Sequence, residues 1–188
     1  MRKPIIEITP NYILGICFAS LIFPLNLLFA WVTAVVLHEA AHYIVLWLGK
    51  IEIYKIKVGL AGAVIDTAPM NAYLELICAA AGPLASLTLL ILIRIFPLLS
   101  MCAAFQAFYN LLPLPPLDGW RILKNLIECL GLSMKICNIT QFVILLILAL
   151  LTCYLTFRLH LGPLPIIAML FLFIKQKFSC KQRRKRVQ

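Results

Sequence analysis

The sequence predicts an all-α multi-span membrane protein with a short β-hairpin at the cytoplasmic side. Of its 188 residues, 63% are hydrophobic and 13% are charged, and the mean hydropathy is +1.01. A soluble domain is about half apolar and about one quarter charged. The apolar residues also form runs that approach the roughly 20 residues needed to cross a bilayer. Lipid must therefore cover much of the chain, and the lipid bilayer is its first expected partner.

About six transmembrane helices are expected. Residues 12–48 form a nearly unbroken apolar run, long enough for two crossings, with a tight turn at 23–26. Residues 50–69 carry β-branched and charged residues and are divided at 59–62, which predicts the hairpin over 51–67. An amphipathic helix of about residues 120–130 is expected to lie along the membrane interface. The remaining spans are expected at about 71–95, 97–112, 139–158 and 163–175.

The whole chain, 1–188, is expected to form one integral-membrane domain. Residues 12–130 form its core, 139–175 add further spans, and 175–188 form a basic cytoplasmic tail. Seven of the 17 Lys and Arg residues lie in that tail, which is typical of a segment that touches anionic lipid rather than nucleic acid. No nucleic-acid partner is expected. The positive-inside rule then places both termini and the hairpin at the cytoplasmic side. The site that residues 38–42 and Asp118 are expected to form should open on the same side.

Two other organisations are not expected. The seven cysteines are scattered and include no CxxC pair, so neither a disulfide framework nor a thiolate metal site is predicted. The first apolar run continues directly into the segment that carries two histidines, so no cleavable signal peptide is predicted. The chemistry must therefore come from polar residues inside the apolar runs.

The most informative of these residues lie in the sequence HEAAH, at 38–42. Residues four apart in a helix share one face, so His38 and His42 can bind one metal ion. Glu39 is offset by about 100° and is placed to act as general base on a water at the metal. The alternative is a pair of core histidines beside a buried glutamate. Ionisable residues inside spans usually serve a function, which favours the metal site.

Asp118 is the expected third ligand, because catalytic zinc commonly takes three protein ligands and keeps one position for water. It follows the proline-rich segment Leu112–Leu117, which cannot be helical. Non-helical backbone at membrane depth is tolerated only where protein or a water-filled cavity covers it. We therefore expect an extended segment to deliver Asp118 to the histidines. The alternative is an exposed turn in which Asp118 is a helix N-cap.

Other polar or small residues accompany these candidates. Gln106 and Asn110 lie about one helical turn apart ahead of the prolines. Gln106 is as well suited to hydrogen-bond between helices as to act in the site. Asn110 is expected to line the site. The small residues of AGPLAS, at 81–86, predict close helix packing more than a direct catalytic role.

The motifs in this order resemble the site-2 protease family of intramembrane metalloproteases, peptidase family M50. HEAAH in a second span, AGPLAS in a third and NLLPLPPLDG at 110–119 carry the resemblance, which covers about 12–130. The small six-span form is similar to the stage IV sporulation protein FB branch. The resemblance implies that His38, His42 and Asp118 are zinc ligands and that Glu39 is the catalytic carboxylate. It also implies that Asn110 positions the substrate. The family commonly has Asn where this chain has Ser86, so that position is left unassigned.

The expected function is zinc-dependent hydrolysis of a peptide bond in or near a transmembrane segment of a membrane-protein substrate. The implied cofactor is Zn²⁺, and the implied setting is a bacterial cell membrane, with a further membrane protein as regulatory partner. The alternative is a non-proteolytic zinc-binding membrane protein, either a carrier or an inactive scaffold. Two histidines and a carboxylate can also hold Fe(II). Glu39 argues against both alternatives, because neither needs a general base.

Overall fold

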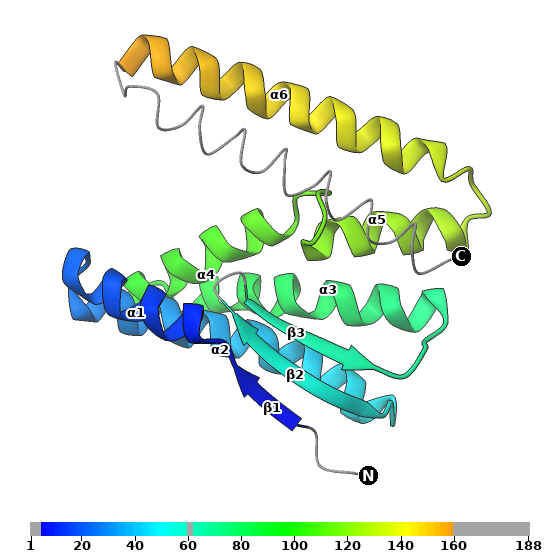
Figure 1. The fold of residues 1–188 in the computed structure, drawn as a ribbon, viewed down its shortest axis with the longest axis horizontal. Helices are drawn as coiled ribbons and strands as arrows, with labels where there is room; N and C mark the ends of the chain where they lie inside the picture. The colour runs from blue at the N-terminus through cyan, green and yellow to red at the C-terminus, as the bar shows by residue number, and fades with distance from the viewer. Residues whose placement is uncertain (1–4, 60–61, 160–188) are drawn as a thin grey trace. The chain divides into compact units, whose positions relative to one another are not determined.

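The computed structural model describes residues 5–59 and 62–159 (Figure 1). The described residues belong to two compact units, with the boundary in the chain between Ser133 and Met134. The first unit contains a small sheet and helices α1 to α5. The described part of the second unit is helix α6 (Lys135–Leu159). The predicted span at 163–175 and the basic tail at 175–188 lie outside the described residues, and the expected single domain stays a prediction.

The first apolar run forms two helices, α1 (Pro10–Ile22) and α2 (Leu25–Leu48). Phe23 ends α1 in an extended conformation, and Pro24 is the N-cap of α2. The proline ring disfavours helical backbone in the residue before it, which explains the break. The predicted turn is confirmed, although it is shorter than expected because Asn26 already belongs to α2.

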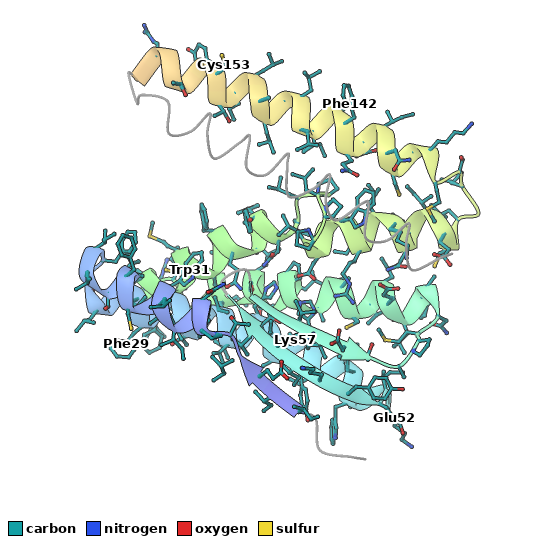
Figure 2. The ribbon with its side chains drawn as sticks, in the orientation of Figure 1. Phe29, Trp31, Glu52, Lys57, Phe142 and Cys153 are labelled. Carbon is teal, nitrogen blue, oxygen red and sulfur yellow. The ribbon has the colours of Figure 1, made fainter. Side chains whose placement is uncertain are left out.

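The predicted hairpin consists of β2 (Ile53–Gly59) and β3 (Gly62–Thr67), which pair antiparallel. A third strand, β1 (Ile5–Ile8), pairs parallel with β2 on its other side. The hairpin is thus part of a three-stranded sheet in the order β1-β2-β3. Nζ of Lys57 in β2 lies 3.6 Å from Oδ2 of Asp66 in β3. Figure 2 labels Lys57 and also Glu52, which precedes β2.

Helix α3 (Ala72–Thr88) begins at Asn71, whose side chain accepts a hydrogen bond from the N–H of Leu74 at 2.8 Å. A short 3₁₀ turn, η1 (Leu89–Leu92), continues it, and α4 (Pro97–Asn110) follows. Helices α2, α3 and α4 pack against one another. Trp31 of α2, labelled in Figure 2, has its ring centroid 5.9 Å from that of Phe105 in α4. These three helices form the framework around the candidate site.

Helix α5 (Asp118–Cys129) lies against α3. The interfacial position expected for this helix stays a prediction; Leu126 is 42% exposed, whereas Asn125 is fully buried. Arg121 helps to explain the orientation, since its Nε lies 3.7 Å from Oε1 of Glu75 on α3. The face that meets α3 is therefore partly polar.

Three described helical segments are long and apolar enough to cross a membrane: Leu25–Leu48, Ala72–Leu92 and Lys135–Tyr154. Helix α1 has 13 residues and α4 has 14. At about 1.5 Å per residue each is near 20 Å long, shorter than the roughly 30 Å hydrocarbon layer. The chain is a mostly helical membrane protein, while the count of six spans stays a prediction.

Candidate metal centre

His38 and His42 lie on one face of α2 and are 1% and 5% exposed. Their Nε2 atoms are 3.3 Å apart. Oδ2 of Asp118, at the start of α5, lies 3.1 Å from Nε2 of His38 and 3.2 Å from Nε2 of His42. One ligand atom from each of the three residues lies within 4.8 Å of the others. The structure thus brings together three side chains that could hold a metal ion.

Hydrogen bonds behind the rings fix which ring nitrogen faces this group. Nδ1 of His42 lies 2.7 Å from the carbonyl oxygen of Cys78. A carbonyl can only accept, so Nδ1 carries the hydrogen and Nε2 keeps its lone pair. Nδ1 of His38 lies 2.9 Å from Oγ of Ser86, a contact in which Nδ1 can donate in the same way. Second partners of this kind orient metal-binding histidines in proteins.

The resulting donor set fits a divalent metal. Two imidazole lone pairs and a carboxylate oxygen face one another at 3.1 to 3.3 Å. Such electron-rich atoms repel unless a cation lies among them, and nitrogen with oxygen ligands suits zinc.

Two glycines leave the space that the group needs. A Cβ at Gly82 would lie 2.3 Å from Nε2 of His42 and 2.7 Å from Nε2 of His38, inside the volume between the ligands. A Cβ at Gly119 would lie 2.1 Å from the carbonyl oxygen of Leu111. Gly82 therefore keeps α3 from filling the site. Gly119 lets the start of α5 approach the end of α4.

Residues 111–117 deliver Asp118 through a series of turns, in which the N–H of Leu114 donates to Leu112 and that of Leu117 to Leu114. The expected extended segment is therefore wrong in conformation, although it is non-helical as the prolines require. The alternative role of Asp118 as an exposed N-cap is also wrong. Leu117 is the N-cap of α5, and the side chain of Asp118 is 13% exposed.

The other predicted residues lie around this group. Nδ2 of Asn110, the last residue of α4, is 3.2 Å from Nε2 of His38. Gln106 is buried one turn earlier, and its Oε1 has no hydrogen-bond partner among the described residues. Oε1 of Glu39 accepts a hydrogen bond from the backbone N–H of Ala63 in β3 at 3.2 Å. The catalytic and positioning roles of Glu39 and Asn110 stay predictions.

Sequence reasoning missed the contribution of α3. Cys78, Gly82 and Ser86 are spaced by four residues and are all buried, so they share the helix face that supports both histidines. The small residues of AGPLAS indicate close packing, and their spacing is the signal that this face meets the candidate metal ligands. The contact between Glu39 and Ala63 had no signal in the sequence, because it depends on how β3 lies against α2.

Comparison with known proteins adds a family resemblance. A search of solved structures matches the chain to the Site-2 Protease from Methanocaldococcus jannaschii, with a TM-score of 0.62 and 27% identity, over 92% of this chain and 88% of that chain. No protein-family model matches the sequence, and no curated protein does. The resemblance expected from HEAAH and the LDG segment is confirmed. Similarity to the stage IV sporulation protein FB branch stays a prediction.

Proposed function

We propose, on the premise that this chain resembles the site-2 protease family, that it is a zinc-dependent intramembrane endopeptidase. It hydrolyses a peptide bond in or near a transmembrane segment of another membrane protein. The observation that carries the proposal is the convergence of His38, His42 and Asp118, whose ligand atoms all lie within 4.8 Å of one another. Glu39 follows His38 directly in the chain and supplies a further carboxylate. A pure metal-binding site has no need of that carboxylate.

The residues divide the chemistry among them. Zinc held by His38, His42 and Asp118 would polarise a peptide carbonyl and lower the pKa of water to about 7. Glu39 accepts a proton from the attacking water and passes it to the leaving amine. Asn110 can donate an amide N–H to the carbonyl oxygen, where negative charge develops.

The substrate must present an extended segment. A transmembrane helix hides its carbonyl groups in internal hydrogen bonds, so it has to unwind locally before hydrolysis. The β-sheet offers a backbone edge on which such a segment can add as a strand. The proline-rich segment does not offer a second edge, because residues 111–117 form turns.

We place this reaction in a bacterial cell membrane, at its cytoplasmic side, with both termini in the cytoplasm. The basic residues of the sequence support this orientation through the positive-inside rule. A regulatory membrane partner is part of the proposal, because a protease in a bilayer needs control over which single-span proteins reach it. Zinc and the transmembrane substrate remain its proposed cofactor and main partner.

The test is co-expression with a panel of tagged single-span membrane proteins. We expect one or more to be cleaved by the wild type and none by Glu39→Gln or Asp118→Asn. Glu39→Gln should keep its zinc, whereas Asp118→Asn should lose most of it, measured by elemental analysis of the purified protein. Glu128→Gln, which changes an exposed acid on α5, is the matched control and should cleave normally.

Two outcomes would contradict the proposal. Cleavage by Glu39→Gln at the wild-type rate would remove the general base from the mechanism. Zinc bound by the wild type without cleavage of any panel member, together with an unchanged phenotype in Glu39→Gln, would support the zinc carrier or scaffold.

A further inference from the structure

The catalytic carboxylate and the sheet edge are directly connected. Ala63, the second residue of β3, donates its backbone N–H to Oε1 of Glu39 at 3.2 Å. The side chain of Glu39 is thus turned toward β3, although His38, the residue before it, faces the candidate metal centre. A carboxylate oxygen held in this way is less free to accept a proton from water.

The same N–H lies on the open edge of the sheet. Among the described residues β3 pairs with β2 on one side only. Since Ala63 donates to Glu39 and not to β2, its N–H points away from β2. Because backbone N–H groups alternate in direction along a strand, the N–H of Ile65 also lies on this open side, while the N–H of Val64 points toward β2. An added strand would need the N–H groups of Ala63 and Ile65.

We propose that Glu39 is held by β3 in the resting protein and is released when an extended substrate segment pairs with the edge of β3. A substrate carbonyl takes the N–H of Ala63, and the Glu39 carboxylate turns to the metal centre. Docking of the substrate and freeing of the general base are then one event. This inference rests on the proposed function, and it assigns Ala63 a positioning role through its backbone.

The edge also explains how such coupling can be specific. A water molecule or a folded transmembrane helix cannot offer carbonyl groups at strand spacing, so neither releases Glu39 efficiently. An unwound segment can do so, because its carbonyl groups are exposed and regularly spaced. The device therefore favours hydrolysis of segments that have already left the helical state.

The first experiment tests the restraint without any substrate. Gly62–Ala63 is the only Gly-Ala pair in the sequence, so full-length protein labelled with ¹³C′-glycine and ¹⁵N-alanine gives one amide signal for Ala63. We expect hydrogen exchange at this amide to be roughly tenfold faster in Glu39→Ala than in the wild type. Glu52→Ala, which removes another acid beside the sheet, should leave it unchanged. An equal exchange rate in Glu39→Ala and the wild type would overturn the inference.

The second experiment tests the release, with fluorescein-labelled casein as an unfolded probe. Proline is tolerated on an edge strand where the missing N–H faces outward. Glu39 is already released in the wild type with bound substrate, so Ala63→Pro should leave kcat unchanged. It removes both the restraint and one substrate hydrogen bond, and because the first loss offsets the second, we expect KM to rise less than it does in Ile65→Pro. Ile65→Pro is the matched control, because it removes an edge N–H that Glu39 does not use. It should raise KM and leave kcat unchanged.

The outcomes separate this inference from the proposed function. A wild type that binds zinc but leaves casein intact counts against the protease function with this probe, while amide exchange still decides whether Glu39 is held. Cleavage by the wild type, with KM of Ala63→Pro raised as much as that of Ile65→Pro while zinc is retained, overturns the release. Should Ala63→Pro lose zinc, the ¹⁵N chemical shift of the Ala63 amide is measured in the wild type with and without casein, because the proposal changes the acceptor of this N–H. An unchanged shift on addition of casein overturns the release.

Discussion

Gly82 decides whether a metal fits between the histidines. The Cβ of Gly82→Ala would lie 2.3 Å from Nε2 of His42 and would fill the ligand volume. We expect zinc content to fall from about one per chain to near zero. A glycine-to-alanine change inside a helix ordinarily favours the helix by roughly 1 kcal/mol, but overlap with a buried ring and the loss of a bound ion both destabilise the fold, so Gly82→Ala should unfold at a lower temperature than the zinc-loaded wild type. Elemental analysis and thermal unfolding in detergent measure the two effects.

The control for this change is Leu84→Ala, on the exposed side of the same helix. It should keep its zinc. Full zinc binding by Gly82→Ala would show that α2 and α3 can move apart at this point, contrary to the packing described above.

Ser86 supports His38 from behind and is fully buried. Ser86→Ala removes the oxygen that lies 2.9 Å from Nδ1 of His38, which leaves the ring free to rotate and its N–H unpaired. Changes to such second partners typically cost about 10- to 100-fold in metal affinity. We expect a loss in that range, measured by competition with a zinc chelator. Thr88→Ala, whose hydroxyl bonds only to its own helix at Ala85, should leave the affinity unchanged.

Residue chemistry explains which parts of this centre could be predicted. HEAAH and the LDG segment identified His38, His42 and Asp118 because ionisable groups are costly in apolar surroundings and therefore noticeable. The carbonyl of Cys78 and the N–H of Ala63 are backbone groups that every residue possesses. Their part in the centre depends on where α3 and β3 lie against α2, which no local pattern shows.

At the scale of elements, α5 is joined to α3 through a chain of charges. Nη1 of Arg121 lies 3.6 Å from Oδ1 of Asp118, and its Nε lies 3.7 Å from Oε1 of Glu75 on α3. Arg121 thereby engages the carboxylate oxygen that does not face the histidines. We expect Arg121→Gln to lower zinc affinity by several-fold to roughly tenfold, less than Asp118→Asn does.

Cobalt substitution gives a second measure of this change, because the visible spectrum of Co²⁺ reports the number and geometry of its ligands. If Arg121 keeps one oxygen of Asp118 away from the metal, the spectrum should differ between Arg121→Gln and the wild type. Lys124→Gln alters another cation on α5 and serves as the control. Identical affinity and spectra in all three proteins would mean that α5 places Asp118 without help from Arg121.

The sheet shows how far element prediction reaches. The hairpin followed from β-branched residues on either side of a glycine-containing turn, which is a local signal. Strand β1 is only Ile5–Ile8, and it pairs in parallel with β2, from which the whole of α1 and α2 separates it in the chain. A short strand with a distant partner leaves little pattern in its own residues. The turns at 111–117 were mistaken for an extended segment for a related reason, since proline excludes helix but is common in both conformations.

At the scale of the whole molecule, the distribution of charge makes the orientation testable. The hairpin lysines, Arg121 and Lys124 are predicted to lie on the same side as the basic tail, and Arg94 and Arg158 are predicted on the opposite side. The positive-inside rule therefore predicts cytoplasmic N- and C-termini. Green fluorescent protein fused to either end should fluoresce, and alkaline phosphatase at the same positions should be inactive.

The short helices make the intermediate positions more informative than the termini. Helices α1 and α4 are each near 20 Å long by the usual rise per residue, so each must tilt little and thin the bilayer locally if it crosses. Six crossings require the loop at 93–96 to face the side opposite the sheet. An alkaline phosphatase inserted after Ile95 should then be active, whereas one inserted after Leu60 should not. Activity at neither position would mean that α3 and α4 enter and leave the membrane on the same side as a re-entrant pair, which would contradict the six proposed spans.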